Sequence, residues 1–187
     1  GIPDLLDEIK YETDWLLKMQ ENDGGVLCVV GVTNFATASP PSADNADRLY
    51  GPKTTSASYS AAAMFAFAAT QFRKVDHVIA QNYAITLQTA AINAYNWAVA
   101  NPGVLFYNSG VLAAGEQEID AYETGMRRLC AAIFLYELTG DVNYKNHVET
   151  QYTQSHLKQW NFVYPFENPT QLTLLYYAHL QGVTPSV

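Results

Sequence analysis

The sequence predicts an all-α fold in which antiparallel helices stand side by side around a ring, as in an α/α toroid. Helix-forming runs fill most of the 187 residues, and one run only, 26–32, is rich in strand-forming residues. The connections between the helical runs are alternately long and short. Alternate connections in such a ring lie on opposite rims, so we expect the long connections together on one face.

The first three helical runs have clear boundaries. The run 4–20 carries leucines and an isoleucine on one stripe and begins at Asp4, which is placed to cap it. The run 54–72 begins with threonines and continues through alanines, which favour helix and let neighbouring helices approach closely. The run 79–100 is followed by Asn-Pro-Gly at 101–103, a strong stop signal.

Three further runs bring the predicted number of helices to about six. The fourth covers 118–139 and ends at Gly140. The fifth extends from about 142 to 158, and the sixth extends from about 169 to 181 and stops at Gly182. The second-to-third and fourth-to-fifth connections are short.

Three long connections are expected on the binding face, because loops held by a rigid scaffold often carry function. The first is rich in Gly, Pro, Ser, Asn and Asp, and its run 26–32 is expected to form a small hairpin edge. The second contains Tyr107, and the third, near Trp160, is heavily aromatic. Trp15 and Trp97 lie within helical runs, so we expect them in the core.

Composition excludes several classes of protein. Hydrophobic residues make up 49% and charged residues 15%, which excludes disorder, and the length suits a single domain, 1–187. A net charge of -8 with only 10 Lys and Arg argues against a nucleic-acid partner. No apolar run approaches the roughly 20 residues that span a bilayer, so no membrane partner is expected. The chain starts without a secretion signal, and we expect the natural chain to begin earlier.

Motifs for most catalytic chemistries are missing from the sequence. There is no phosphate-binding glycine loop, no paired CxxC and no G-x-S-x-G. The four histidines are too scattered for a zinc site and are interpreted as surface or capping residues: His77, His147, His156 and His179. The two cysteines, Cys28 and Cys130, leave the redox compartment open.

Carboxylates are the remaining candidates, because glycosidic hydrolysis usually needs two of them on opposite sides of the scissile bond. Acids in loops mostly face solvent or turn the chain, so no specific pair is assigned. The acids expected on the long-loop face are Asp23, Asp44, Asp47, Glu116, Glu118, Asp120 and Glu167.

Four segments resemble glycoside hydrolase family 9, in the order that the family has them. IPDLLDEIKYETDWLLKMQ resembles a helix that typically reads PDLLDE and later LLKMQ. YGPKTTSASYSAAAMFAFA resembles the lead into an alanine-rich helix, and AAINAYNWAVANP resembles a helix that ends in NP. AAIFLYELTGDVNY resembles the family's AAAELYxATGDxxY. Together the segments extend over almost the whole chain.

The resemblance implies an (α/α)6 barrel of twelve helices, a cellulase that hydrolyses β-1,4-glucans with inversion. About six helices are then roughly half of the ring, and 1–187 is the middle part of the catalytic domain. The family's base belongs to a DAGD-like motif before PDLLDE, and its acid is a glutamate near the domain's C-terminus. The string DNAD at 44–47 follows PDLLDE, so no catalytic residue is assigned and the isolated chain is expected to be inactive.

The resemblance also implies the surroundings of the protein. The partners are a β-glucan or oligosaccharide substrate and the remainder of the catalytic domain, and a half ring should expose two apolar helix faces. No cofactor is required, although a structural calcium ion is compatible with the family. The expected location is secreted or periplasmic.

The predicted substrate-binding residues come from the three long connections. Asp47, Arg48 and Tyr50 stand where family endoglucanases often place a histidine and tryptophans before Gly-Pro, and Tyr107 and Trp160 complete the set. Tyr50 could stack on a sugar or pack under its own loop, and at least one aromatic residue near Trp160 is expected in the core.

A second departure from the family lies in the fourth helix. Met126 and Arg127 replace an acidic pair that many members carry, which puts any role of that pair in doubt. Two alternatives therefore stay open. One is a non-catalytic helical toroid module for sugar binding or protein interaction, and the other is a different α/α-toroid polysaccharide-degrading enzyme that uses Tyr or His as acid or base.

Overall fold

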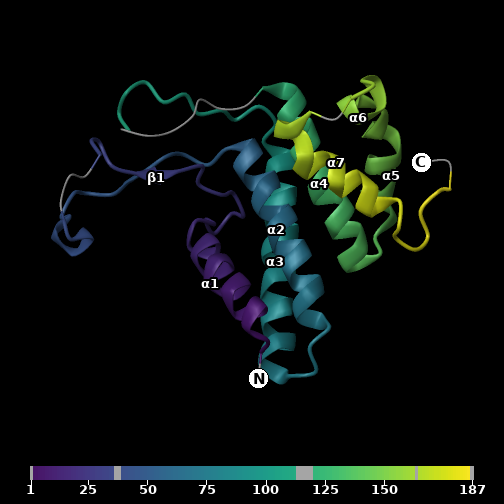
Figure 1. Cartoon of the computed structure of the whole chain (residues 1–187), viewed down its shortest axis with the longest axis horizontal. Coiled ribbons are helices and arrows are strands. Elements are labelled where there is room, and N and C mark those ends of the chain that lie inside the picture. Colours follow the sequence, from purple (N-terminus) through teal and green to yellow (C-terminus); the bar gives the residue numbers. More distant parts are fainter. Residues whose placement is uncertain (1, 36–38, 113–119, 163, 186–187) are drawn as a thin grey trace.

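The computed structural model describes residues 2–35, 39–112, 120–162 and 164–185, and α-helices dominate all of these segments except the first long loop. Figure 1 shows their arrangement. The helices are α1 (Asp4–Lys18), α2 (Thr55–Arg73), α3 (Val78–Ala100), α4 (Ala121–Thr139), α5 (Val142–Gln151), α6 (His156–Gln159) and α7 (Asn168–Tyr177). Short 3-10 turns cover Pro41–Ala43, Tyr152–Gln154 and Pro165–Glu167.

Capping side chains set most of the helix starts. Thr54 accepts a hydrogen bond from the Ala57 backbone N–H at the start of α2, and Asp120 accepts one from Glu123 at the start of α4. The α1 prediction needs correction, because Pro3 takes the N-cap position and Asp4 is already helical without a side-chain cap bond. Proline suits this place since its missing N–H would have no helical partner there.

Small side chains let the central helices pack closely. Ala62 and Ala66 of α2, Ala91 of α3 and Ala132 of α4 have no exposed surface. Phe65 of α2 is also fully buried, so α2 lies between α3 and α4 with apolar contacts on both sides. The antiparallel helices and the alanine-rich core agree with the predicted toroid.

The α1 helix lies against α2 and α3 on the other side of the core from α5. The Thr13 hydroxyl lies 2.8 Å from the Tyr83 hydroxyl of α3, which also donates to the Asp14 carboxylate at 2.7 Å. Trp15 of α1 is 48% exposed, so its expected place in the core is wrong. Trp97 is half-buried, and its indole N–H is bonded to Asp23.

The long connections gather at one end of the helices, as predicted, and the short turns lie at the other (Figure 1). In the first long connection, β1 (Val30–Gly31) pairs antiparallel with β2 (Leu49–Tyr50). The predicted hairpin edge therefore exists but is short. A Cβ added at Gly51 would lie 2.6 Å from the Val29 side chain, so only glycine fits this close approach.

Two helix faces that point away from the core are apolar and open to solvent, as a half ring should leave them. Met64 of α2 is 52% exposed, and Leu172 and Leu175 of α7 are 64% and 54% exposed. Among the described residues, no helix combines the length and the apolar character needed to cross a membrane.

Candidate functional site

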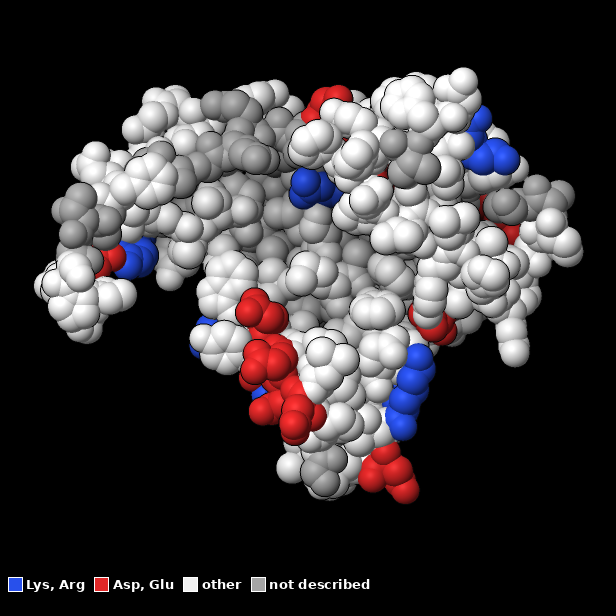
Figure 2. Space-filling view, viewed as in Figure 1, with Lys and Arg blue, Asp and Glu red and all other residues white. Residues whose placement is uncertain are grey.

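A groove of about 440 Å³ lies between α2, α4 and α7 and extends to the long-loop end of the helices. Its lining combines apolar side chains such as Met64 and Phe134 with polar and charged groups such as Ser60 and Arg127. In Figure 2, acidic side chains gather over α1, while the face over α2 and α7 carries few charges. The full lining is Ser60, Ala63, Met64, Tyr122, Glu123, Met126, Arg127, Cys130, Phe134, Phe166, Glu167, Pro169, Thr170 and Thr173.

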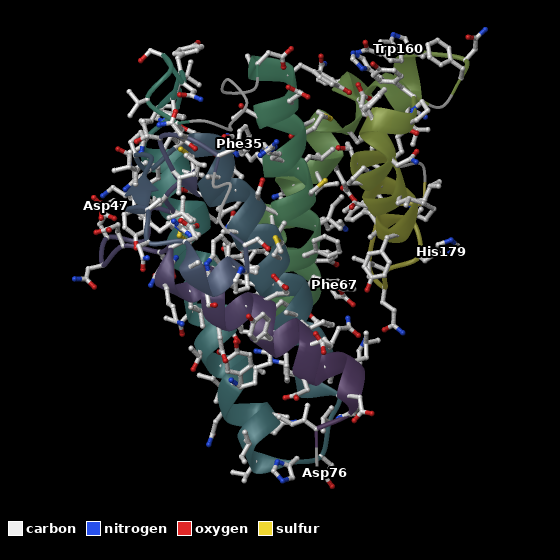
Figure 3. The ribbon with its side chains drawn as sticks, turned by 60° about the vertical axis from the view of Figure 1, so that its left-hand side comes forward. Phe35, Asp47, Phe67, Asp76, Trp160 and His179 are labelled. Atoms are coloured by element: carbon white, nitrogen blue, oxygen red, sulfur yellow. The ribbon has the colours of Figure 1, made fainter. Side chains whose placement is uncertain are left out.

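Four rings, which we call the aromatic stack, begin at the groove with Tyr122, the member of the stack that lines it. Tyr122 lies in the first turn of α4, and its ring centroid lies 3.9 Å from that of His156. The His156 ring lies 3.6 Å from Trp160, and Trp160 lies 5.2 Å from Phe162. All three pairs are nearly parallel, with interplanar angles of 18°, 14° and 15°. Figure 3 shows Trp160 at the upper edge of the molecule.

The Glu167 carboxylate holds two members of the stack, Tyr122 and His156, in place. One carboxylate oxygen, Oε1, lies 2.6 Å from His156 Nδ1, and the Tyr122 hydroxyl donates to the other at 3.2 Å. The His156 backbone N–H donates to the Tyr122 hydroxyl at 3.0 Å. These contacts join α4, α6 and the start of α7, so hydrogen bonds between three elements fix the position of the stack.

Trp160 is the predicted site residue that the structure places in the aromatic stack, and it keeps 37% of its surface exposed. It does not line the groove itself. The prediction that His156 is a surface or capping residue is wrong, because its ring is sandwiched between Tyr122 and Trp160. His77 does cap, since its Nδ1 accepts from the Ile79 backbone N–H at the start of α3. No local sequence pattern links 122, 156 and 167, so sequence reasoning missed the cluster.

The other predicted site residues line neither the groove nor the aromatic stack. Figure 3 shows Asp47 at the opposite edge of the molecule from Trp160. Arg48 Nη2 pairs with Asp44 at 2.7 Å, and the same side chain donates to the Ala46 carbonyl, so it holds a local turn. Tyr50 and Tyr107 are 65% and 62% exposed and line neither wall nor floor of the groove. This exposure removes the possibility that Tyr50 packs under its own loop.

Arg127 places a positive charge in the groove. Its Nη1 donates to the Ser60 hydroxyl at 3.1 Å, and none of the described carboxylates forms an ion pair with it. The neighbouring Cys130 thiol has its pKa raised by burial, which disfavours the reactive thiolate. The groove therefore offers binding groups and no activated nucleophile at this point.

Several of the described carboxylates are engaged in structural contacts. Asp23 accepts hydrogen bonds from Lys53 at 2.7 Å and from the Trp97 indole at 3.0 Å, and the Lys53 bond is the main cause of its lowered pKa. The Asp44 pKa is lowered by the Ala46 backbone N–H and by Arg48. A general acid needs a raised pKa, and each resolved carboxyl shift in the described ranges is downward. Glu116 and Glu118 lie outside the described residues.

Across the part of the chain that the structure describes, no three His, Cys, Asp or Glu side chains lie together as a metal site.

Comparisons with known proteins agree with this fold. The model of glycosyl hydrolase family 9 matches residues 1–184. Endoglucanase D of Acetivibrio thermocellus is 35% identical over 158 residues, which cover 82% of this chain and 24% of that protein. A cellodextrinase of Butyrivibrio fibrisolvens is 33% identical over 145 residues, which cover 77% of this chain and 25% of that protein. The chain thus spans about a quarter of the length of these relatives.

A solved structure shows the same arrangement of helices. The crystal structure of a metagenome-derived glycoside hydrolase family 9 endoglucanase superposes with a TM-score of 0.81 at 25% identity. The superposition covers 100% of this chain and 33% of that one.

Proposed function

The chain belongs to glycosyl hydrolase family 9, and we propose that it forms part of a catalytic domain that hydrolyses β-1,4-glucans such as cellulose. Its helices are a portion of the family's (α/α)6 barrel. The observation that carries the proposal is the family match over 1–184 together with the superposition on a family 9 endoglucanase. The toroid places long connections on one rim, where a polysaccharide can lie across the ring.

We propose that the aromatic stack binds one sugar of the glucan. Sugar rings present flat C–H faces, which pack on aromatic rings, and a hydroxyl-lined edge, which needs polar partners. Trp160 keeps 37% of its surface exposed, and its ring stacks on His156 at 3.6 Å and on Phe162 at 5.2 Å. The ring is therefore held in place before a sugar arrives, which lowers the entropic cost of binding. Tyr50 and Tyr107 on other rim loops extend the binding surface in this proposal.

The two catalytic carboxylates belong, in this proposal, to segments outside the chain. An inverting glycosidase holds its acid and base roughly 6.5–9.5 Å apart across the scissile bond. Asp23 and Asp44 have lowered pKa values and fixed partners, which do not suit a proton donor. The residues described above would bind and orient the glucan, and proton transfer would fall to the other part of the barrel.

The remainder of the catalytic domain is the proposed partner of the open apolar faces. Covering Met64, Leu172 and Leu175 would remove exposed apolar surface from water, which favours association. We further propose a secreted or periplasmic location, because cellulose is too large to enter a cell. Acid and base hydrolysis requires no redox or group-transfer cofactor.

The test is hydrolysis of a soluble β-1,4-glucan by the whole natural protein that carries this chain, followed by NMR of the newly formed reducing end. We expect the α-anomer to appear first, because inversion converts a β-linkage to an α-hemiacetal. Initial formation of the β-anomer would contradict the inverting mechanism. Glucan binding without any hydrolysis would favour a sugar-binding module.

A further inference from the structure

A second cavity of about 510 Å³ lies on the other side of α4 from the groove, between α4, α5 and the short helices that follow α5. Its α4 wall comes from one helix face, because residues 121, 125 and 128 are spaced by three or four positions. Residues 123, 127, 130 and 134 line the groove instead. Tyr122 and Met126 lie on the boundary and contact both spaces. The volume falls within the range of about 300–1,000 Å³ that small-molecule sites occupy.

Arg128 gives this cavity a positive charge that the described residues do not neutralise. Its guanidinium carbon lies 5.9 Å from the ring centroids of both Tyr59 and Tyr95, and Nε donates to the Tyr95 hydroxyl at 3.4 Å. None of the described carboxylates forms an ion pair with it. A guanidinium has five N–H donors, so most of them have no acceptor among the described residues. In a chain of net charge -8, such a half-buried cation marks a place for an anion.

Neutral polar groups surround the charge. The Gln151 and Gln154 side chains line the cavity and make no hydrogen bond to other described residues, so their amides can donate and accept. Gln159 already donates to the Thr153 and Gln154 carbonyls, which leaves its amide oxygen as an acceptor. These groups match hydroxyls better than they match a bare ion.

His147 and Tyr122 complete the walls. Burial, with a smaller contribution from the nearby Arg128, lowers the pKa of His147 to about 4, so its ring is neutral at pH 7 and offers one donor and one acceptor. The Tyr122 ring supplies an aromatic surface. The cavity therefore combines one fixed cation, several neutral hydrogen-bonding groups and one aromatic wall.

We propose that this cavity binds a small anionic sugar of the uronate type. The carboxylate would pair with the Arg128 guanidinium, and the hydroxyls would bond to the glutamine amides and to His147. The site is separate from the groove and does not depend on the proposed hydrolysis.

The test uses saturation-transfer NMR on the whole natural protein, with glucuronate as the probe and with glucose and acetate as controls. Titration gives a dissociation constant for each compound. We expect glucuronate to bind at least about tenfold more tightly than either control, because it alone combines the charge-assisted bond with hydroxyl contacts. If glucose bound as tightly as glucuronate, the proposed role of the carboxylate charge would be wrong. If acetate bound as tightly as glucuronate, the proposed contacts to the sugar hydroxyls would be wrong.

Variants locate the binding within the molecule. Arg128→Met keeps an unbranched apolar chain beside Tyr59 and Tyr95 but removes the charge, and we expect a loss of glucuronate affinity of roughly tenfold or more. Arg127→Met is the matched control, since it removes the neighbouring charge from the groove, and it should leave glucuronate affinity unchanged. Gln151→Glu, at an exposed position, places a negative charge at the cavity without disturbing the core. It should weaken glucuronate binding as well, so the proposal stays testable if Arg128→Met does not fold. Unchanged affinity in folded Arg128→Met or in Gln151→Glu, or a loss in Arg127→Met, would overturn the proposal.

Discussion

Replacing Glu167 with alanine tests whether this carboxylate holds the aromatic stack in place. The side chain is 14% exposed and that of His156 is 22% exposed, so both partners are largely shielded from water. The carboxylate lies 2.6 Å from His156 Nδ1 and accepts from the Tyr122 hydroxyl at 3.2 Å. Hydrogen bonds to charged groups contribute roughly 1.5–3 kcal/mol each, and water can reach part of the emptied site, so we expect a loss of about 3 kcal/mol in the free energy of unfolding.

The Glu167→Ala variant should also bind glucan less tightly. Without the carboxylate, His156 no longer has a fixed position behind Trp160, so glucan affinity should fall by roughly fivefold as pre-organisation is lost. Urea unfolding followed by tryptophan fluorescence measures the first effect, and affinity electrophoresis in a β-glucan gel measures the second. Glu123→Ala is the control, because this groove residue makes no ion pair with the described residues and should cost less than about 1 kcal/mol. Equal losses in the two variants, or unchanged glucan affinity in Glu167→Ala, would refute the reasoning.

Three further predictions concern the proposed sugar-binding residue Trp160, two glycines and one histidine. Trp160→Ala should raise KM for soluble glucan several-fold with little change in kcat, measured by release of reducing sugar from the whole protein. Gly140→Ala should lower the free energy of unfolding by about 1 kcal/mol, because φ is 72° there, whereas Gly125→Ala, inside α4 with open space around its Cβ, should raise it by about 0.5 kcal/mol. A loss in both glycine variants would show that the backbone angle is not the cause. The folded-state pKa of His147 is lowered from 6.5 to about 4, chiefly by burial and also by Arg128, so the unfolded chain takes up this proton first. The contribution of His147 to stability is therefore complete above about pH 6.5 and is lost as the pH falls toward 4. In urea unfolding measured at a series of pH values, His147→Gln should make the free energy of unfolding depend less on pH between about 6.5 and 4. An unchanged pH dependence in this variant would contradict the prediction.

Local signals in the sequence predicted the positions of the long helices but not every boundary. Thr54 and Gly140 are a hydroxyl cap and a left-handed stop, and each acts where the sequence predicts. Asp120 caps α4 inside the run that was predicted to be helical from 118, so the sequence did not identify this cap. The fifth predicted helix is divided, because the Ser155 hydroxyl accepts from the Leu157 N–H and starts a new helix. A buried serine that caps inside a predicted helix cannot be distinguished by pattern from a serine on its surface.

The candidate site was less predictable, because distant parts of the chain build it. Trp160 was predicted to bind substrate because it lies in an aromatic loop, and the structure stacks it on His156, which is bonded to Glu167. Contact between these residues and Tyr122 depends on how α4 packs against α7, which no local period encodes. Arg48 was expected to bind substrate, yet an arginine four positions after Asp44 can pair locally, and the structure contains that pair.

The central claim is that this chain supplies binding surface to a family 9 barrel while other segments supply the catalytic carboxylates. The most direct measurement compares β-1,4-glucan hydrolysis by the whole protein, by its Asp44→Asn/Asp47→Asn double variant and by the 187-residue chain alone. We predict that the double variant keeps its kcat within about twofold of the parent and that the chain alone releases no reducing sugar. Hydrolysis by the chain alone, abolished when Asp44 and Asp47 are replaced, would contradict the claim.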